Sequence, residues 1–383
     1  MNKLRVLSVF GTRPEAIKMC PLVREMSARP EIEAQVCVTA QHRELLDQML
    51  EAFAVRPDYD LDIMSRGQTL PEITSRVLLG MGDIFAQARP DVVLVHGDTT
   101  TTFSAGLAAF YARVAVGHVE AGLRSYDLRS PWPEEANRRL VGQLADVHFA
   151  PTARNRENLK NERITEHVFV TGNTAIDAIR HTVRPDYVFE DAALRALPAG
   201  TRLVAVTAHR RENQGEPMEN ILAALRALAE AHPDVYFVYP VHPSPAVREP
   251  VYRVLSGLRN MLLLPPLGVL DMHNLMARSL FVMTDSGGLQ EEAPALGKPV
   301  LVLRRETERP EAVEAGTVRV VGTERAVIVA EAEELLRGGA RYHAMAHAVN
   351  PYGDGHACAR IADDLLYWAG LRARPAEDFH AAL

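Results

Sequence analysis

The chain has 383 residues, of which 47% are hydrophobic and 24% are charged. A chain of this length is too long to fold around one ordinary hydrophobic core, so we predict two domains. Its formal net charge of -7 argues against extensive binding to nucleic acid but leaves room for a local basic site for phosphate. Cys20, Cys37 and Cys358 lack metal-ligand spacing and cannot all pair, which predicts a reducing, cytoplasmic compartment. No apolar run approaches the length of a membrane span. The first apolar run is not followed by the small residues of a signal-peptide cleavage site, so we predict that it forms a strand.

Short apolar runs alternate along the chain with longer segments of helical periodicity. The first series of predicted strands covers residues 4–10, 34–40, 91–97, 114–120, 147–151 and 167–172. The second series covers residues 202–209, 235–242, 261–266, 279–288, 299–304 and 318–322. Continuous apolar strands separated by helix-length segments are typical of parallel sheets that are covered on both faces. The sequence therefore predicts an α/β protein with two doubly wound domains.

The boundary between the two series falls between residues 172 and 200, where the periodicity is weak. We expect an N-terminal domain of residues 1–172 and a C-terminal domain of residues 173–356. Residues 357–383 begin with a helical pattern, "ACARIADDLLYWAGL", and we expect this segment to pack back on the first domain.

Charged and polar residues follow several strands of the first predicted domain. They are Thr12, Arg13, Glu15 and Lys18 after the first strand, Asp98 after the third and Glu120 after the fourth. Ligands of open α/β sheets bind beyond these carboxyl ends of the strands. Thr12 and Glu15 have the spacing of a capping box, and Asp98 has the alternative role of capping the helix that follows. Glu120 has little structural reason to be there, because an unpaired buried carboxylate is costly.

The segment "SPWPEEANRR" places Glu134 and Glu135 behind two prolines at a predicted helix start. Acidic residues at this position stabilise a helix by offsetting its dipole, and proline is tolerated in the first turn. The alternative is that a carboxylate here transfers protons, and the sequence around it leaves both interpretations open.

The second predicted domain carries a candidate phosphate site in "DSGGLQEEAPALGKP". Ser286, Gly287 and Gly288 expose backbone N–H groups at a helix start, which suits a phosphate, although glycine pairs also occur in tight turns. A carboxylate one turn later, Glu291 or Glu292, could bind ribose hydroxyls. His209 and Arg210 in "HRREN" and His242 in "VHPSP" also follow strands, and a histidine there has the alternative of a purely structural role. Neither a Gly-x-Gly-x-x-Gly pattern nor a Walker motif is present.

The chain resembles the non-hydrolysing UDP-N-acetylglucosamine 2-epimerases of bacteria. The resemblance rests on these segments, in the family's order: "VFGTRPEAIKM", "TAQHRELLDQML", "DVVLVHGDTTTT", "GHVEAGL", "SPWPEEANRR", "VTGNTAID", "HRREN", "DSGGLQEEAPALGKPVLVLR", "TERPEAVEAGT" and "NPYGDG". It implies the glycosyltransferase-B fold, with two Rossmann-like domains facing each other across a cleft. It also implies reversible conversion of UDP-N-acetylglucosamine into UDP-N-acetylmannosamine by elimination and re-addition of UDP, with no metal or other cofactor, in a protein that is commonly a homodimer.

The resemblance assigns roles to residues of this sequence. It implies catalytic roles for Lys18, Asp98, Glu120, Glu134 and His209. It implies contacts to UDP for Arg13, Lys18, Met272, Ser286, Gly287, Gly288, Glu292 and Arg309. It implies a second, activating UDP-N-acetylglucosamine beside the active site, held by Gln41, Glu44, Arg66, Glu135, Arg210 and His242.

Two of these positions depart from the family's pattern. Met272 stands where relatives place an aromatic residue that stacks on uracil, and its polarizable sulfur can still lie against a base. Glu44 stands where some relatives carry glutamine.

Three other functions remain open at the level of the sequence. A hydrolysing 2-epimerase would share the elimination step but release free N-acetylmannosamine and UDP. A glycosyltransferase of the same fold would use the same nucleotide half without needing three carboxylates in the first domain. A nucleotide-sugar-binding protein without activity would bind UDP and leave the sugar unchanged.

Overall fold

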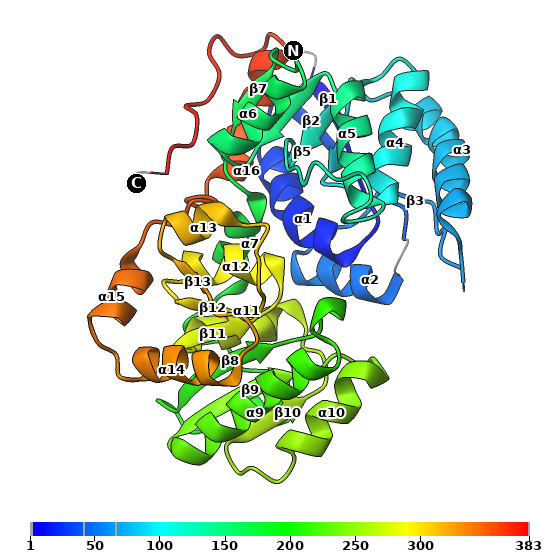
Figure 1. Cartoon of the computed structure of the whole chain (residues 1–383). Coiled ribbons are helices and arrows are strands. Elements are labelled where there is room, and N and C mark those ends of the chain that lie inside the picture. Colours follow the sequence, from blue (N-terminus) through cyan, green and yellow to red (C-terminus); the bar gives the residue numbers. More distant parts are fainter. Residues whose placement is uncertain (1–2, 41–42, 66, 382–383) are drawn as a thin grey trace. The chain divides into compact units, whose positions relative to one another are not determined.

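The computed structural model describes residues 3–40, 43–65 and 67–381, which form two compact units. The first unit runs to His181 and resumes at Tyr352, and the second is built on Thr182–Pro351. Each unit has its own sheet with helices packed on it (Figure 1).

In the first unit, the described residues form seven parallel strands in the order β3-β2-β1-β4-β5-β6-β7. Their bounds are β1 Leu4–Phe10, β2 Ile32–Val38, β3 Tyr59–Asp60, β4 Val92–His96, β5 Ala115–Val119, β6 Val147–Ala150 and β7 Val168–Val170. The order reverses between β1 and β4, which is where doubly wound sheets bind ligands. The expectation of six strands was wrong by one, because β3 has only two residues and its sequence carries no apolar run.

Helices on both faces of this sheet bury its apolar strands. Their bounds are α1 Arg13–Ser27, α2 Arg43–Ala52, α3 Leu70–Ala88, α4 Thr100–Tyr111, α5 Glu134–Leu144, α6 Ala153–Asn161, α7 Thr174–Thr182 and α16 Ala357–Trp368. Helix α4 packs between α3 and α5, as Figure 1 shows, and α1 packs against α16. Val93 and Val95 of β4 are fully buried in one core with Val77 and Met81 of α3.

The first unit extends beyond the predicted boundary at residue 172. Helix α7 is bound to the start of α16, since the buried carboxylate of Asp177 accepts hydrogen bonds from the backbone N–H groups of Ala357 at 3.1 Å and Cys358 at 2.9 Å. The backbone N–H of Phe379 donates to the carbonyl of Val170 at 2.7 Å. The segment after residue 351 therefore belongs to the first unit together with α7.

In the second unit, the described residues form six parallel strands in the order β10-β9-β8-β11-β12-β13. Their bounds are β8 Arg202–Thr207, β9 Val235–Pro240, β10 Met261–Leu264, β11 Phe281–Thr284, β12 Val300–Val302 and β13 Val318–Val320. All six overlap the predicted strands. The predicted strand over 279–288 extends too far, because Gly287 already begins a helix.

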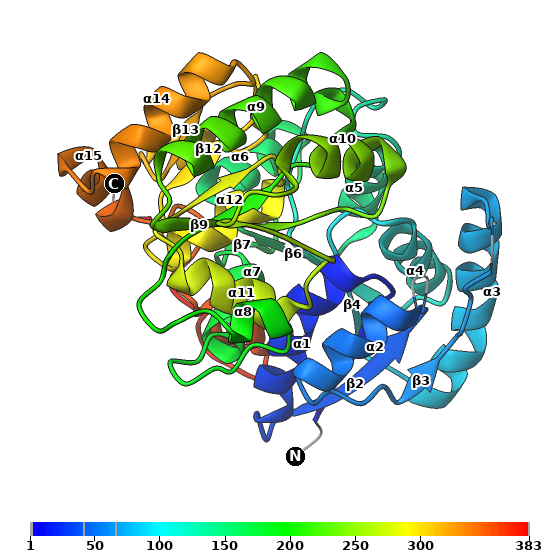
Figure 2. The same cartoon turned by 90° about the horizontal axis from the view of Figure 1, so that it is seen from below.

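The helical elements of the second unit are α8 Ala192–Arg195, η1 Arg211–Asn213, α9 Glu216–Ala231, α10 Pro245–Leu255, α11 Val269–Arg278, α12 Gly287–Ala295, α13 Pro310–Glu314, α14 Arg325–Leu336 and α15 Ala340–His347. Helix α9 packs against α10 and α14, which Figure 2 shows from below. Apolar residues from β8, β9 and α9 share one core, among them Val206, Phe237 and Leu225, all fully buried. Within the described residues, no helix is both long and apolar enough to cross a membrane.

Candidate active site

The loop after β1 is fixed to the loop after β4 by a buried carboxylate, Glu15. Its Oε2 accepts hydrogen bonds from the backbone N–H groups of Gly11 at 3.1 Å and Thr12 at 2.8 Å, and its Oε1 accepts from the Thr99 hydroxyl at 2.7 Å. Burial raises the pKa of Glu15, and these hydrogen bonds oppose the rise. The predicted capping interaction from Glu15 to Thr12 is therefore present, and it fixes the start of α1, which carries Arg13 and Lys18.

The carboxylate of Glu120, directly after β5, contacts side chains from other elements of the first unit. Its backbone has a φ of 64°, a left-handed conformation that is uncommon for a residue other than glycine. The Lys18 ammonium on α1 is ion-paired with its Oε2, and the Asn173 amide, which follows β7, donates to the same oxygen at 3.0 Å. The His96 ring at the end of β4 lies 3.8 Å from that oxygen. The structure thus brings together Lys18 and Glu120, which the sequence named, with Asn173 and His96, which it did not.

His96 is neutral in this arrangement. Its side chain is buried, and burial lowers its pKa to about 4. Its Nε2 has no hydrogen-bond partner among the described residues. The positive charge beside Glu120 therefore comes from Lys18.

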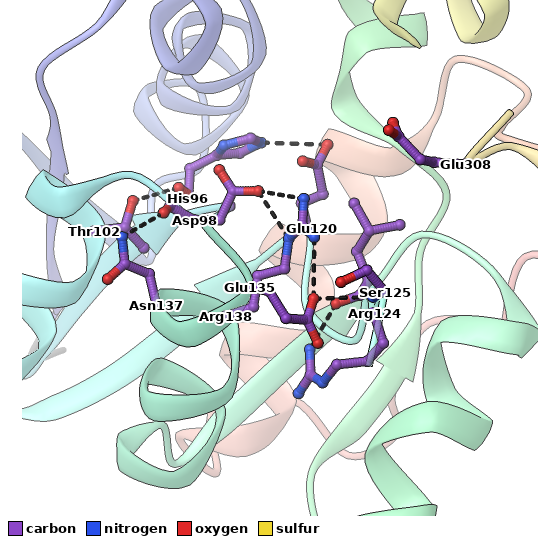
Figure 3. Close-up of polar contacts among 12 residues, drawn as sticks. His96, Asp98, Thr102, Glu120, Arg124, Ser125, Glu135, Asn137, Arg138 and Glu308 are labelled. Atoms are coloured by element: carbon purple, nitrogen blue, oxygen red, sulfur yellow. Dashed lines mark hydrogen bonds and ion pairs between the residues drawn. The ribbon is translucent and has the colours of Figure 1, made fainter. Parts of the chain in front are cut away.

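Asp98, after β4, is held by Arg138 of α5. Its Oδ2 accepts from Nε of Arg138 at 2.8 Å and from Nη2 at 2.7 Å, as Figure 3 shows. The alternative role of Asp98 as a helix cap is wrong, because Thr99 is the cap and its hydroxyl accepts from the Thr102 N–H at 3.1 Å. The carboxylate of Asp98 is only partly buried and is oriented by a guanidinium on a neighbouring helix.

Glu134 and Glu135 begin α5 and have different surroundings. Glu135 is fully buried and accepts hydrogen bonds from the backbone N–H groups of Ser125 at 2.9 Å and Tyr126 at 3.2 Å and from Arg138 at 3.2 Å (Figure 3). Glu134 is partly exposed and forms no ion pair or side-chain hydrogen bond with the residues that the structure describes. The first carboxylate is available for a ligand, whereas the second fixes the 125–126 loop.

Asp285 organises the corresponding loop of the second unit, and the sequence reasoning missed it. Its carboxylate is fully buried, and its Oδ2 accepts from the backbone N–H groups of His209 at 2.7 Å and Arg210 at 2.8 Å and from the Asn213 amide at 3.0 Å. The "HRREN" segment after β8 is therefore wrapped around a carboxylate that follows β11.

His209 is presented by this loop with its ring partly exposed. The ring is stacked on that of His242 with centroids 5.6 Å apart, and its Nδ1 lies 3.5 Å from Oδ1 of Asp285. Burial lowers the pKa of His209, and the charge of Asp285 opposes this effect. The neutral ring is thereby favoured near pH 7, where it can accept or pass on a proton.

The start of α12 has the features of a phosphate site. Ser286 is the N-cap, and Gly287 and Gly288 are the first two helical residues, so their N–H groups and the helix dipole point outward. A Cβ atom on Gly287 would lie 3.6 Å from Nη2 of Arg210 and 3.8 Å from Nη2 of Arg309. Two guanidinium groups therefore lie beside this helix start, and the guanidinium of Arg309 is ion-paired with Glu291.

Glu292 lies one turn into α12 and is almost buried. Its Oε2 is 3.4 Å from Nε2 of His273, whose Nδ1 is 2.7 Å from the Thr182 hydroxyl. Met272, the residue before His273 on α11, is partly buried. Of the two carboxylates that the sequence offered for ribose, Glu291 is engaged by Arg309 and Glu292 by a neighbouring histidine.

Four of the six residues of the predicted activating site lie in the described parts of the chain. Gln41 and Arg66 lie outside the described residues, and Glu44 is described only as part of helix α2. In the second unit, Arg210 donates to the carbonyl of Asp285 at 3.3 Å, and His242 stacks on His209. Both residues therefore lie at the "HRREN" segment after β8. Glu135 is buried with a structural role in the first unit, and any role in ligand binding stays a prediction.

Residues that the sequence reasoning did not select turn out to orient those that it did. They are His96, Arg138, Asn173 and Asp285. His96, Asn173 and Asp285 lie at or shortly after strand ends, and Arg138 is four residues after Glu134, one helical turn away, but the sequence does not show which side chains they contact. In the part of the chain that the structure describes, no group of three or more His, Cys, Asp or Glu side chains could hold a metal ion.

Comparisons with known proteins found similarity over most of the chain. The family model described as UDP-N-acetylglucosamine 2-epimerase matches residues 24–366. The chain is 52% identical to the UDP-N-acetylglucosamine 2-epimerase of Bacillus subtilis (strain 168) over 99% of each chain. It is 48% identical to the UDP-GlcNAc 2-epimerase of Neisseria meningitidis, solved with UDP-GlcNAc bound, with a TM-score of 0.87 over 95% of this chain and 100% of the other.

A more distant comparison concerns the fold alone. The calicheamicin glycosyltransferase CalG4 is 15% identical and aligns with a TM-score of 0.60 over 98% of this chain and 100% of the other. Together with the two parallel sheets, this similarity assigns the chain to the glycosyltransferase-B fold with two Rossmann-like domains, as the resemblance implied.

Proposed function

Because this chain belongs to the UDP-N-acetylglucosamine 2-epimerase family, we propose that it epimerises carbon 2 of UDP-N-acetylglucosamine reversibly and without net hydrolysis. UDP leaves carbon 1 while the proton on carbon 2 is removed, which gives a glycal-like intermediate. The same UDP then adds back to carbon 1 as a proton returns to the opposite face of carbon 2, giving UDP-N-acetylmannosamine. The cycle consumes no water and requires an acid and a base on opposite faces of the sugar.

The observation that carries this proposal is the distinct setting of the three candidate carboxylates. Glu120 is ion-paired with Lys18, and Asp98 is held by two N–H groups of Arg138. Each of these two carboxylates is oriented by a cationic side chain, so we assign the base roles to them. Glu134 begins a helix and keeps its carboxylate available to a ligand. Acid and base roles need groups whose surroundings differ in this way.

The second unit supports the binding of UDP. We propose that the diphosphate binds at the start of α12, where the N–H groups of Gly287 and Gly288 and the guanidinium of Arg309 meet. Ser286 caps the same helix, and Glu292 accepts from the ribose hydroxyls. Charge-assisted hydrogen bonds of this kind also stabilise UDP as it leaves with increasing negative charge.

Other proposed contacts complete the nucleotide and sugar sites. Met272 lies against the uracil ring through its polarizable sulfur. Arg13 and Lys18, at the start of α1, add positive charge for the diphosphate. His209, whose neutral form burial favours, exchanges a proton with the reacting groups.

A hydrolysing 2-epimerase remains the second candidate, and the products distinguish the two. The purified protein is incubated with UDP-N-acetylglucosamine, and the mixture is separated by anion-exchange chromatography. The proposal predicts an equilibrium mixture of the two UDP-sugars with no accumulation of UDP. Stoichiometric UDP and free N-acetylmannosamine would instead place the protein in the hydrolysing class.

We also propose a homodimer that forms through the first unit. Large apolar side chains are exposed on three adjacent helices, namely Leu79 on α3, Phe110 and Tyr111 on α4, and Leu140 on α5. Exposed apolar side chains that gather on neighbouring helices favour association with a second copy of the chain. Light scattering after gel filtration tests the mass, and a monomeric mass at micromolar concentration would contradict the proposal.

Two further expectations complete the proposed function. A second molecule of UDP-N-acetylglucosamine activates the enzyme through the predicted site that includes Arg210 and His242, and a sigmoidal rate curve would support this. The protein acts in the cytoplasm, which its free and buried cysteines support, because thiols stay reduced there.

A further inference from the structure

The loop between β7 and α7 is packed against the segment by which the chain returns to the first unit. Tyr352 is the first residue of that segment, and its carbonyl accepts a 2.7 Å hydrogen bond from the backbone N–H of Asn173. Gly172 has a φ of 85°, and a Cβ atom there would lie 3.4 Å from the Cα atom of Gly353. The backbone of Asn173, just before α7, is therefore held in place by the returning segment.

The side chain of Asn173 forms hydrogen bonds with Ala175 and Glu120. Its Oδ1 accepts from the backbone N–H of Ala175 at 2.9 Å, at the start of α7. Its Nδ2 donates to Oε2 of Glu120 at 3.0 Å. Because an amide oxygen can only accept, the bond from Ala175 fixes which end of the amide faces Glu120. The side chain is also buried, so it has little freedom to turn.

The groups that face the Glu120 carboxylate in the first unit include Lys18, His96 and Asn173, which come from different elements. Lys18 is a cation on a long flexible stem, and its ammonium is also proposed to approach the diphosphate. His96 is neutral because burial lowers its pKa, and at 3.8 Å it is beyond hydrogen-bond distance. Among Lys18, His96 and Asn173, Asn173 is thus the neutral and rigidly held hydrogen-bond donor to Glu120.

We propose that Asn173 is a positioning residue for epimerisation, which fixes the orientation of the Glu120 carboxylate and keeps it ionised. The inference rests on the proposed function, in which Glu120 is a proton-transfer group. Hydrogen bonding to the charged form of a carboxylate favours that form. The same residue links Glu120 to Tyr352, where the chain re-enters the first unit.

The variant Asn173→Asp tests this role. It keeps an oxygen to accept from Ala175, so α7 keeps its cap, but it replaces the donor to Glu120 by a second carboxylate oxygen. Two adjacent carboxylates resist simultaneous ionisation. The expected result is a kcat at least tenfold lower at pH 7 and an acidic limb of the pH–rate profile at higher pH, with unchanged affinity for UDP.

Asn158→Asp is the matched control. The Asn158 amide donates to the carbonyl of Gly122 at 2.9 Å, and its Oδ1 accepts from the Tyr126 hydroxyl at 2.7 Å. The change therefore also removes one donor, keeps one acceptor and adds one charge in the same unit, without touching Glu120. Its pH–rate profile should match that of the wild type.

The outcomes separate this inference from the proposed function. An active wild type with an unshifted profile in Asn173→Asp would overturn the positioning role alone, as would an equal shift in Asn158→Asp. A wild type that does not epimerise its substrate overturns the proposed function and this inference with it. If Asn173→Asp does not fold, Asn173→Ala replaces it, with a lower kcat and a shifted acidic limb expected and a wild-type profile contradicting the role.

Discussion

Arg138 contacts the carboxylates of both Asp98 and Glu135, which have different roles. Its Nε and Nη2 lie 2.8 Å and 2.7 Å from Oδ2 of Asp98, and its Nη1 lies 3.2 Å from Oε2 of Glu135. Glu135 is fully buried and holds the 125–126 loop, whereas Asp98 is partly exposed at the end of β4. One guanidinium therefore connects a proposed catalytic group to the rigid part of the first unit.

Replacing Arg138 by lysine should lower kcat at least tenfold, because lysine keeps the charge but lacks the planar fork that orients Asp98. The affinity for UDP should be unchanged, since the proposed UDP residues of α12 lie in the other unit. Kinetics and calorimetric titration with UDP measure the two quantities. Arg139→Lys is the control, because Arg139 is partly exposed and its Nε lies 3.6 Å from Oε1 of Glu162, away from Asp98. Equal kcat values for Arg138→Lys and Arg139→Lys would contradict the role of Arg138 in orienting Asp98.

Glu134→Gln and Glu135→Gln should affect different properties of the protein, catalysis and stability respectively, although the residues are adjacent. Glu134→Gln should lower kcat by about a hundredfold or more, the scale of acid–base catalysis, with little change in melting temperature. Glu135→Gln should lower the free energy of unfolding by about 1–3 kcal/mol, because charge-assisted hydrogen bonds inside the protein are weakened. Activity assays and thermal melts of both variants test this, and a stable, inactive Glu135→Gln would reverse the assignment.

Arg309→Ala should weaken the binding of UDP about tenfold or more, the equivalent of one charge-assisted hydrogen bond to phosphate. Calorimetric titration measures the Kd, and a melting curve checks that the loss of the ion pair with Glu291 has not unfolded the protein. Arg305→Ala is the control, since that side chain is exposed. An unchanged Kd for UDP in a folded Arg309→Ala would exclude Arg309 from the site.

Stability should fall as the pH falls below about 6.5, because three buried histidines resist protonation. Burial lowers the pKa of His96 and His118 to about 4 and that of His148 to about 3, from 6.5. The unfolded chain then binds more protons than the folded one between pH 6.5 and about 4, so protonation favours unfolding in that window. Each histidine contributes a slope of up to about 1.4 kcal/mol per pH unit.

The variant His148→Gln isolates one of these contributions. Its melting temperature should fall less than that of the wild type between pH 7 and pH 5, since it has one buried histidine fewer to protonate. An exposed histidine, His356, provides the control variant His356→Gln, which should keep the wild-type dependence. Identical pH dependence in all three proteins would contradict the explanation from burial.

The strands were predictable because their apolar runs are long and continuous. All six strands of the second sheet were located, and β3 was missed because two residues cannot show a pattern. Glu120 was recognisable as a site residue, since a carboxylate at the end of a buried strand needs a partner. That reasoning located Glu120 but not its partners.

The partners depend on spatial contacts that sequence distance does not reveal. Asn173 is 53 positions from Glu120, and Asp285 is 76 from His209. Each pair is joined because parallel strands end at the same edge of a sheet. The roles of Glu134 and Glu135 could not be separated in advance either, because one residue of helical rotation decides which of them is buried.

The most direct test of the proposed reaction is proton NMR of the purified protein with UDP-N-acetylglucosamine in deuterated water. Elimination and re-addition exchange the proton on carbon 2 with solvent, so we predict UDP-N-acetylmannosamine with deuterium at carbon 2. UDP-N-acetylglucosamine that stays protonated and unconverted, in a protein that binds UDP, would contradict the central claim.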